Sequence, residues 1–139
     1  MKDAFYISTD KSKLNLELIH KFLSNDSYWA IGRTLETVQT SIQHSLCFGA
    51  YKDDEQVRFA RVVTDYSVFA WILDVFILKD YRKNGLGKML MGAIMTHPSL
   101  QKMQRWGLAT NDAHGLYETY GFHRIKRPET FMEIVARPS

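Results

Sequence analysis

A short glycine-rich turn with three cations is the part of this sequence best suited to bind an anion. It consists of Arg82, Lys83, Asn84, Gly85, Leu86, Gly87 and Lys88. The turn lies between a predicted strand and a predicted helix, where glycines let the backbone approach a ligand and the first helical amides point outward. Arg82, Lys83 and Lys88 add positive charge, so the turn suits a pyrophosphate better than a single carboxylate.

Two common phosphate-binding loops do not fit this turn. A nucleoside triphosphate loop has a glycine five residues before Gly87, where this chain has Arg82, and Ser or Thr after the lysine, where it has Met89. A dinucleotide fingerprint has a third glycine where Leu90 stands, and it lies in the first strand-turn-helix unit of its domain. A basic surface turn that binds nothing remains the alternative on these residues alone.

Asp74 is a second candidate for chemistry, because this carboxylate lies inside the apolar run of residues 68–78. Burying an unpaired charge is costly, so such a residue is usually either paired or functional. Asp74 is therefore a candidate general base, or a group that holds the ammonium of an acceptor. A structural ion pair with Arg61 on the preceding strand is an equal alternative.

Alternating apolar residues and helical spacing predict the elements that position these groups. The predicted strands cover residues 4–9, 46–51, 57–64, 68–78 and 106–109, with one or two final strands within residues 122–135. The predicted helices begin after the N-caps Asn15 and Thr34, at Lys88 and at Ala113. Pro98 and Gly121 end the last two helices. The aromatic pair Tyr28 and Trp29 falls in the loop between the first two helices.

The turn resembles the signature of the GCN5-related N-acetyltransferase (GNAT) family, which is Arg or Gln, two residues, Gly, one residue, then Gly or Ala after a long central strand. Arg82, Gly85 and Gly87 match all three positions. Residues 113–122, AHGLYETYGF, are similar to a second family segment, Ala-x-x-Leu-Tyr-x-x-x-Gly-Phe. The resemblance, which covers residues 71–122, implies the acyl-CoA N-acyltransferase fold: an α/β (α+β) fold with a mixed, mostly antiparallel central sheet flanked by helices.

The resemblance implies acetyl-coenzyme A (acetyl-CoA) as cosubstrate. In the family, the glycine turn binds the pyrophosphate through backbone amides, which assigns that role to residues 83–88. The central strand offers main-chain groups to the pantetheine arm and the acetyl carbonyl, here from Phe76, Ile77 and Leu78. Many members carry Asn seven residues before the tyrosine. This chain has Thr110 there and Asn111 one place along, so Asn111 is the nearest candidate for that contact.

The resemblance also suggests roles for three aromatic residues. Tyr117 is expected near the thioester sulfur as general acid, because a phenol with an ordinary pKa of about 10 is protonated at neutral pH. A phenol that only hydrogen-bonds at a helix end is the alternative. Water relays often replace a side-chain base such as Asp74 in this family. Tyr28 and Trp29 lie where the family builds acceptor specificity, so they either wall the acceptor pocket or pack in the core.

Composition narrows the class of protein. The chain has 139 residues, of which 45% are hydrophobic and 24% charged, so residues 1–139 are expected to form a single globular domain. The apolar runs are shorter than the ~20 residues that span a bilayer, and the N-terminus lacks the features of a secretory signal. Cys47 has no second cysteine to pair with, and we expect it to be a buried strand thiol rather than a nucleophile. A cytoplasmic protein without a membrane partner is therefore expected.

The remaining patterns argue against two further kinds of site. The net charge is only +3 and the basic residues are scattered, which is not typical of a nucleic-acid-binding protein. The five histidines have no metal-ligand spacing, so no metal is expected.

We therefore expect an N-acetyltransferase that moves the acetyl group of acetyl-CoA to a primary amine of a small molecule or a protein. The alternative is a catalytically silent coenzyme A binding module of the same fold, although the presence of Tyr117 and of the complete glycine turn argues against it. The last strands of some relatives pair between subunits, so a homodimer is possible for this chain.

Overall fold

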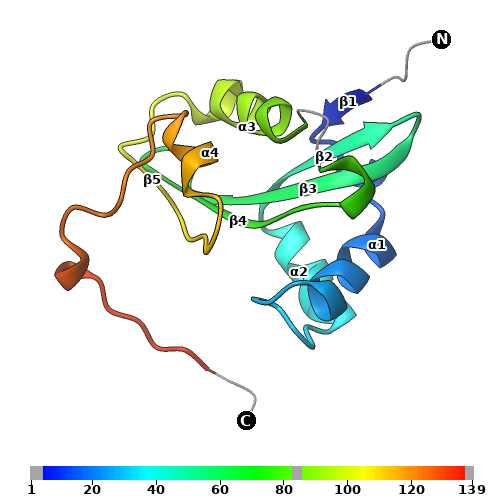
Figure 1. The fold of residues 1–139 in the computed structure, drawn as a ribbon, viewed down its shortest axis with the longest axis horizontal. Coiled ribbons are helices and arrows are strands. Elements are labelled where there is room, and N and C mark those ends of the chain that lie inside the picture. Colours follow the sequence, from blue (N-terminus) through cyan, green and yellow to red (C-terminus); the bar gives the residue numbers. More distant parts are fainter. Residues whose placement is uncertain (1–4, 83–85, 137–139) are drawn as a thin grey trace.

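The computed structural model describes residues 5–82 and 86–136 and contains one five-stranded sheet (Figure 1). Its strands are β1 (Phe5–Ser8), β2 (Leu46–Lys52), β3 (Glu55–Thr64), β4 (Phe69–Ile77) and β5 (Arg105–Leu108). Its α-helices are α1 (Leu16–Lys21), α2 (Leu35–Gln43), α3 (Leu86–Thr96) and α4 (His114–Glu118). The strands lie in chain order and pair antiparallel, except that β4 and β5 are parallel. The predicted mixed, mostly antiparallel sheet is confirmed.

Local signals in the sequence account for where the first two α-helices begin. The Asn15 side chain accepts a hydrogen bond from the backbone N–H of Leu18 at 3.0 Å, at the start of α1. Thr34 does the same for Thr37 at 3.2 Å, at the start of α2. Both predicted N-caps are confirmed, because each side chain satisfies an amide that has no partner within its helix.

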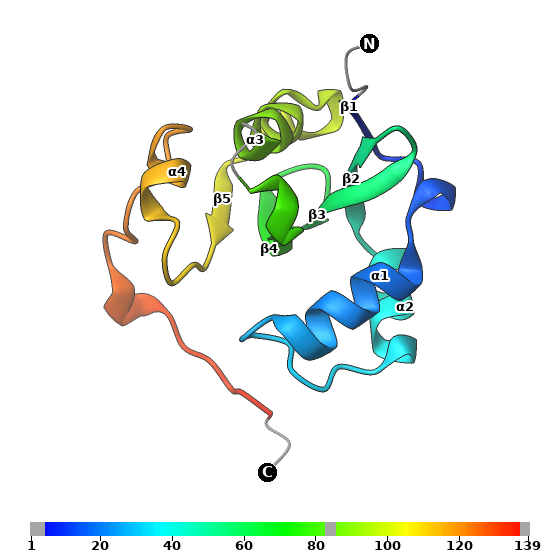
Figure 2. The same ribbon diagram turned by 45° about the vertical axis from the view of Figure 1, so that its right-hand side comes forward.

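The helices cover both faces of the sheet. Figures 1 and 2 show α1 and α2 on one face and α3 and α4 on the other. Phe59 of β3 belongs to the core under α1 and α2, whereas its neighbour Ala60 belongs to the core under α3 and α4. This alternation follows from the period of two in a strand. None of the helices in the described part of the chain is long and apolar enough to cross a membrane.

The strands β4 and β5 diverge halfway along β4. They pair only from Phe69 to Ile72 on β4, although β4 continues to Ile77. Phe76 of β4 pairs with Phe59 of β3, and Leu73 pairs with Arg61. Between these two pairs β4 has one residue more than β3, so β4 contains a bulge. Asp74 lies in this bulge with a φ of +55°, in the left-handed region. Because a bulge bends its strand, this segment of β4 leaves β5 and opens a gap in the sheet.

The predicted final strands are wrong for this chain. Residues 123–136, here called the C-terminal arm, form no strand and contain only a short 3-10 turn, Pro128–Thr130. The arm runs from the end of α4 past β5 and away from the body of the domain (Figures 1 and 2). A strand needs a neighbouring backbone to satisfy its amides, and the arm has none alongside it within the described residues. Met132 and Ile134 are accordingly 97% and 99% exposed.

Candidate active site

The gap between β4 and β5 brings together residues that are far apart in the sequence. The backbone N–H of Asn111, in the loop after β5, donates a hydrogen bond to the Tyr28 hydroxyl at 3.3 Å. The Trp29 indole N–H donates to Asp74 Oδ1 at 2.9 Å. Tyr28 is also close enough to Tyr117 to raise the pKa of its phenol. The loop between α1 and α2 therefore meets β4, the loop after β5, and α4 at one place.

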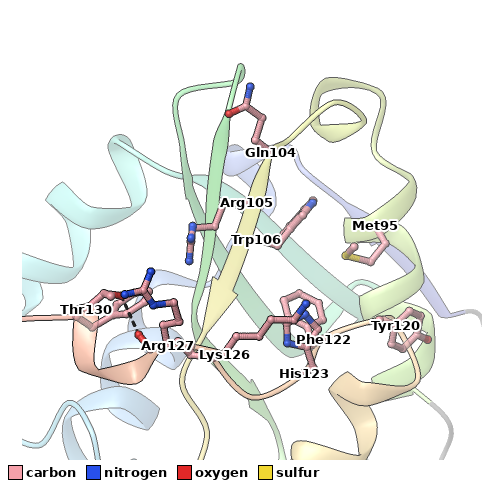
Figure 3. A pocket seen from close by; sticks show the side chains of 13 residues that line it. Met95, Gln104, Arg105, Trp106, Tyr120, Phe122, His123, Lys126, Arg127 and Thr130 are labelled. Atoms are coloured by element: carbon pink, nitrogen blue, oxygen red, sulfur yellow. Dashed lines mark hydrogen bonds between the residues drawn. The ribbon is translucent and has the colours of Figure 1, made fainter.

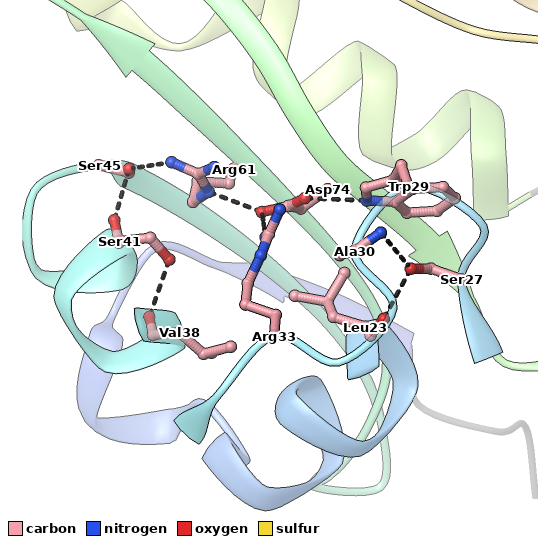
Figure 4. Close-up of polar contacts among 10 residues, drawn as sticks. All are labelled: Leu23, Ser27, Trp29, Ala30, Arg33, Val38, Ser41, Ser45, Arg61 and Asp74. Atoms are coloured by element: carbon pink, nitrogen blue, oxygen red, sulfur yellow. Dashed lines mark hydrogen bonds and ion pairs between the residues drawn. The ribbon is translucent and has the colours of Figure 1, made fainter. Parts of the chain in front are cut away.

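Asp74 is buried and makes ion pairs with two arginines (Figure 4). Its Oδ2 accepts hydrogen bonds from Arg33 Nη1 at 2.8 Å and from Arg61 Nε at 2.9 Å. Its Oδ1 accepts the Trp29 indole N–H, and Arg61 Nη1 also donates to Ser45 Oγ at 3.1 Å. Both carboxylate oxygens are thus engaged. This geometry favours the ion pair with Arg61, one of the two alternatives for Asp74, over the role of general base.

Replacing Asp74 by Asn should lower the free energy of unfolding by about 3 kcal/mol, because two cations then lose their counter-charge at a buried position. Denaturant unfolding followed by fluorescence measures this change. Glu129→Gln is the matched control, since Glu129 pairs with Arg127 at 3.3 Å but the two side chains are 66% and 75% exposed. That control should cost less than about 1 kcal/mol. Equal stability of the two variants would contradict a structural role for Asp74.

Tyr117 is buried in α4 and lines a pocket of about 850 Å³ that Trp71, Leu108 and Thr110 also line. Its ring packs edge-on against Phe122 with centroids 6.0 Å apart. Burial raises the pKa of the phenol above its usual 10. Tyr117 is therefore protonated at neutral pH and has a proton to give, as a general acid must.

Tyr120 differs from Tyr117 in the use of its hydroxyl. It donates a hydrogen bond at 2.9 Å to the backbone carbonyl of Lys88 in the first turn of α3. This hydrogen bond connects the end of α4 to α3. The hydroxyl proton of Tyr120 is engaged in it, unlike that of a general acid.

Part of the glycine turn can be placed in the structure. Lys83, Asn84 and Gly85 lie outside the described residues. Leu86 and Gly87 form the start of α3, and Lys88 follows with an exposed side chain. Arg82 Nε donates a hydrogen bond to the Ile77 carbonyl at 3.2 Å, which anchors the start of the turn to the end of β4.

At the end of β4, the main chain of Ile77 is turned away from β3, and its carbonyl accepts the hydrogen bond from Arg82. The Leu78 N–H donates to the Val57 carbonyl at 3.0 Å, so it points toward β3. Successive residues of a strand turn their backbone groups to opposite edges, so those of Ile77 point into the gap. Of the three residues predicted to offer main-chain groups, Ile77 is thus turned toward the gap, while Phe76 pairs with Phe59 of β3.

Two arginines at this site escaped the sequence-based prediction. Arg33 binds Asp74 from the loop before α2, and no local pattern indicates that contact. Arg58 is buried in β3, where its side chain interrupts an apolar face shared with Ala60 and Val62. A charged residue within an apolar strand pattern is visible in the sequence, and it could have identified Arg58 as a candidate site residue.

Thr110 stands where many family members carry asparagine. Its Oγ1 accepts hydrogen bonds from the backbone N–H groups of Ala113 at 3.1 Å and Asp112 at 3.4 Å. Thr110 therefore shapes the entry to α4, while Asn111 beside it is exposed and bound to Tyr28 through its backbone.

Two other candidate chemistries receive no support from the structure. Cys47 is buried, and burial raises the pKa of its thiol to about 11, so it is a strand thiol rather than a nucleophile. Within residues 5–82 and 86–136, no group of three or more His, Cys, Asp or Glu is arranged to hold a metal ion.

A second pocket, of about 620 Å³, lies between β5 and the C-terminal arm (Figure 3). Trp106 of β5 and Phe122 line it, with ring centroids 6.4 Å apart, and Phe131 of the arm closes part of it. Arg105 lies over the Phe131 ring at 5.6 Å. Within the described residues, the arm forms no strand beside β5, although Phe131 contacts Arg105.

Comparison with known proteins identifies the family. The family described as "Acetyltransferase (GNAT) domain" matches residues 43–124, which is more than half of the 139-residue chain. A crystallised GNAT-family protein from Xanthomonas campestris pv. campestris is 49% identical with a TM-score of 0.93, over 96% of this chain and 94% of that one. A protein of Gibberella zeae, named provisionally as an acetyltransferase, is 26% identical over 81% of this chain and 75% of that protein.

A Staphylococcus aureus protein of unknown function, described as a probable acetyltransferase, has a similar fold. It is 20% identical with a TM-score of 0.78, over 96% of this chain and 100% of that one. The match to the family covers β2 through α4, including the glycine turn and Tyr117. This chain belongs to the GNAT family of acetyltransferases.

Proposed function

We propose that this protein is an N-acetyltransferase that transfers the acetyl group of acetyl-CoA to a primary amine of a small molecule or a protein. The observation that carries the proposal is the gap between β4 and β5, beside which the buried phenol of Tyr117 and the Tyr28–Trp29 loop come close together. We assign this gap as the place where the thioester of acetyl-CoA and the acceptor amine react.

The start of α3 and the end of β4 fit the coenzyme. A helix N-terminus favours anions, and α3 begins at Leu86, within the glycine turn. We assign the pyrophosphate to residues 82–88 and the pantetheine arm to the edge of β4 at Ile77. The hydrogen bond from Arg82 to the Ile77 carbonyl supports this assignment, because it keeps the two binding segments adjacent.

The reaction needs little more than positioning and one proton donor. The neutral amine attacks the thioester carbonyl, a C–N bond forms and the C–S bond breaks. Tyr117 gives its proton to the departing sulfur, which leaves as the thiol. Because the oxygens of Asp74 already accept three hydrogen bonds, we assign removal of the proton from the acceptor ammonium to water. Acetyl-CoA supplies the activated acetyl group.

The acceptor side is assigned to the α1–α2 loop. Tyr28 and Trp29 are 56% and 40% exposed, which favours a pocket wall over core packing. Their rings meet edge to face with centroids 4.9 Å apart, and the indole N–H is fixed on Asp74. Aromatic faces attract cations and apolar groups, so they suit an amine that carries such a group.

Binding of the cosubstrate can be tested by thermal unfolding. At a hundred times its dissociation constant, acetyl-CoA should stabilise the protein by about 2.7 kcal/mol and raise the melting temperature by roughly 8 °C. ATP at the same concentration is the control for unspecific phosphate binding and should shift the curve much less. A curve that moves with ATP but not with acetyl-CoA would overturn the assignment.

We also propose that the C-terminal arm pairs with a second copy of the chain to form a homodimer. The arm exposes Met132 and Ile134 almost completely, and the edge of β5 beside it carries the two pockets. Light scattering after gel filtration should give a dimer mass. The double variant Met132→Glu, Ile134→Glu should be monomeric, whereas Ile31→Glu, at another exposed apolar position, should remain a dimer. A monomeric wild-type protein would contradict the proposal.

A further inference from the structure

Arg58 is a buried cation with unsatisfied donors. It lies in the middle of β3, opposite Ala50 of β2 and Ile77 of β4, and its side chain is only 1% exposed. Its Nε and Nη1 have no hydrogen-bond partner among the residues that the structure describes. Buried arginines are almost always paired, so an unpaired one requires an explanation.

A second arginine on the same strand shows the contrast. Arg61 lies on the opposite face of β3 and is neutralised by Asp74 at 2.9 Å. No comparable carboxylate faces Arg58 in the described part of the chain. Arg61 therefore forms an ion pair, whereas no carboxylate among the described residues neutralises Arg58.

Arg58 lies on the face of β3 that α3 and α4 cover (Figure 1). Arg58 shares its face of β3 with Ala60 and Val62, which pack in the same core as Tyr117. The charge of Arg58 lowers the pKa of the Tyr117 phenol, against the larger effect of burial, which raises it. Burial lowers the pKa of Arg58 itself to about 10, so the guanidinium is still cationic at neutral pH.

Other charged and titratable groups around Tyr117 act in the opposite direction. Asp112, in the loop before α4, and Tyr28, in the α1–α2 loop, both raise the pKa of the phenol. Of these three groups in the described part of the chain, Arg58 therefore favours the ionised form of Tyr117.

We propose that Arg58 is a positioning residue that makes Tyr117 a stronger acid, by stabilising the tyrosinate that forms when the phenol gives its proton to the coenzyme A thiolate. This inference rests on the proposed function. As the C–S bond breaks, the proton moves from Tyr117 Oη to sulfur, and the negative charge moves from sulfur to the phenolate. The tyrosinate later regains a proton released by the acetylated amine, through solvent. A buried phenol alone would resist ionisation, and the cation of Arg58 offsets that resistance.

The test separates charge from packing with two substitutions. Arg58→Met removes the charge and keeps most of the apolar volume, whereas Arg58→Lys keeps the charge. Each is combined with 3-fluorotyrosine at position 117, whose phenol is more acidic than that of tyrosine and can be titrated by ¹⁹F NMR without any ligand. We expect Arg58→Met to raise the pKa of this phenol and Arg58→Lys to leave it close to the wild-type value.

The second readout is the kinetics and stability of the Arg58 variants that keep the natural tyrosine at position 117. Arg58→Met should lower kcat about tenfold to a hundredfold with KM within about twofold, because the coenzyme is still bound and only the acid is weakened. Its melting temperature should be unchanged or higher, since an apolar side chain replaces an unpaired buried charge. If Arg58→Met does not fold, Arg58→Gln removes the same charge.

The possible outcomes are distinct. An unchanged phenol titration in Arg58→Met would overturn the inference, as would a loss of acetyl-CoA affinity without a change in titration, which would make Arg58 a coenzyme contact. A shifted titration in a protein that acetylates no amine would refute the proposed function and still support the coupling of Arg58 to Tyr117.

Discussion

Tyr117→Phe is expected to lower kcat about a hundredfold to ten-thousandfold while leaving the dissociation constant of acetyl-CoA nearly unchanged. The substitution removes only the hydroxyl, and the ring keeps its edge-on packing against Phe122. Burial keeps this phenol protonated, so the substitution removes the proton donor that we propose for the departing thiolate. Thiol release measures kcat, and calorimetry with acetyl-CoA measures binding separately.

Tyr120→Phe is the matched control, because it removes the same atom three residues along. It breaks the hydrogen bond to the Lys88 carbonyl and should cost about 1 kcal/mol of stability with little effect on turnover. If Tyr120→Phe slows the reaction and Tyr117→Phe does not, the assignment of the acid is wrong. Full activity in both variants would mean that water protonates the thiolate and that the enzyme works by proximity and backbone polarisation.

Gly87→Asp should weaken acetyl-CoA binding at least about a hundredfold. The substitution adds a side chain and a negative charge in the first turn of α3, where the pyrophosphate is proposed to bind, and like charges brought together cost several kcal/mol. Folding should survive, because an acidic residue in the first turn of a helix favours the helix dipole. Calorimetric titration with acetyl-CoA, beside a melting curve of the unliganded variant, separates the two effects.

Gly92→Asp provides the same change of charge roughly 7.5 Å further along α3. A Cβ added at Gly92 meets no atom within 4 Å, so this variant should fold and bind acetyl-CoA with an affinity close to that of wild type. Equal affinities for Gly87→Asp and wild type would place the phosphates elsewhere.

Structural features that depend on residues close together in the chain could be predicted from the sequence. Asn15 and Thr34 cap helices within their own turns, so their pattern is local. The alternation of strands β2, β3 and β4 could likewise be read directly. The ion pair between Asp74 and Arg61 joins adjacent strands, and the sequence left it as one of two alternatives for Asp74.

Features that depend on distant parts of the chain could not be derived in this way. The contact between Tyr28 and Asn111 joins two loops 83 residues apart, and Arg33 reaches Asp74 only because the α1–α2 loop folds over β4. The bulge at Asp74 has a φ of +55°, which its apolar neighbours do not indicate. The C-terminal arm has the composition of a strand, but a strand forms only where a second backbone is available.

An assay of acetyl transfer from acetyl-CoA to an amine tests most directly whether the protein is an N-acetyltransferase. Wild type and Tyr117→Phe are incubated with acetyl-CoA and a panel of polyamines, amino acids, amino sugars and lysine peptides, and free thiol and acetylated product are both quantified. We expect at least one amine to give thiol and product in equal amounts with wild type, at a rate that falls about a hundredfold or more in Tyr117→Phe. Tight binding of acetyl-CoA without acetylation of any amine would contradict the enzyme assignment and indicate a coenzyme A binding module instead.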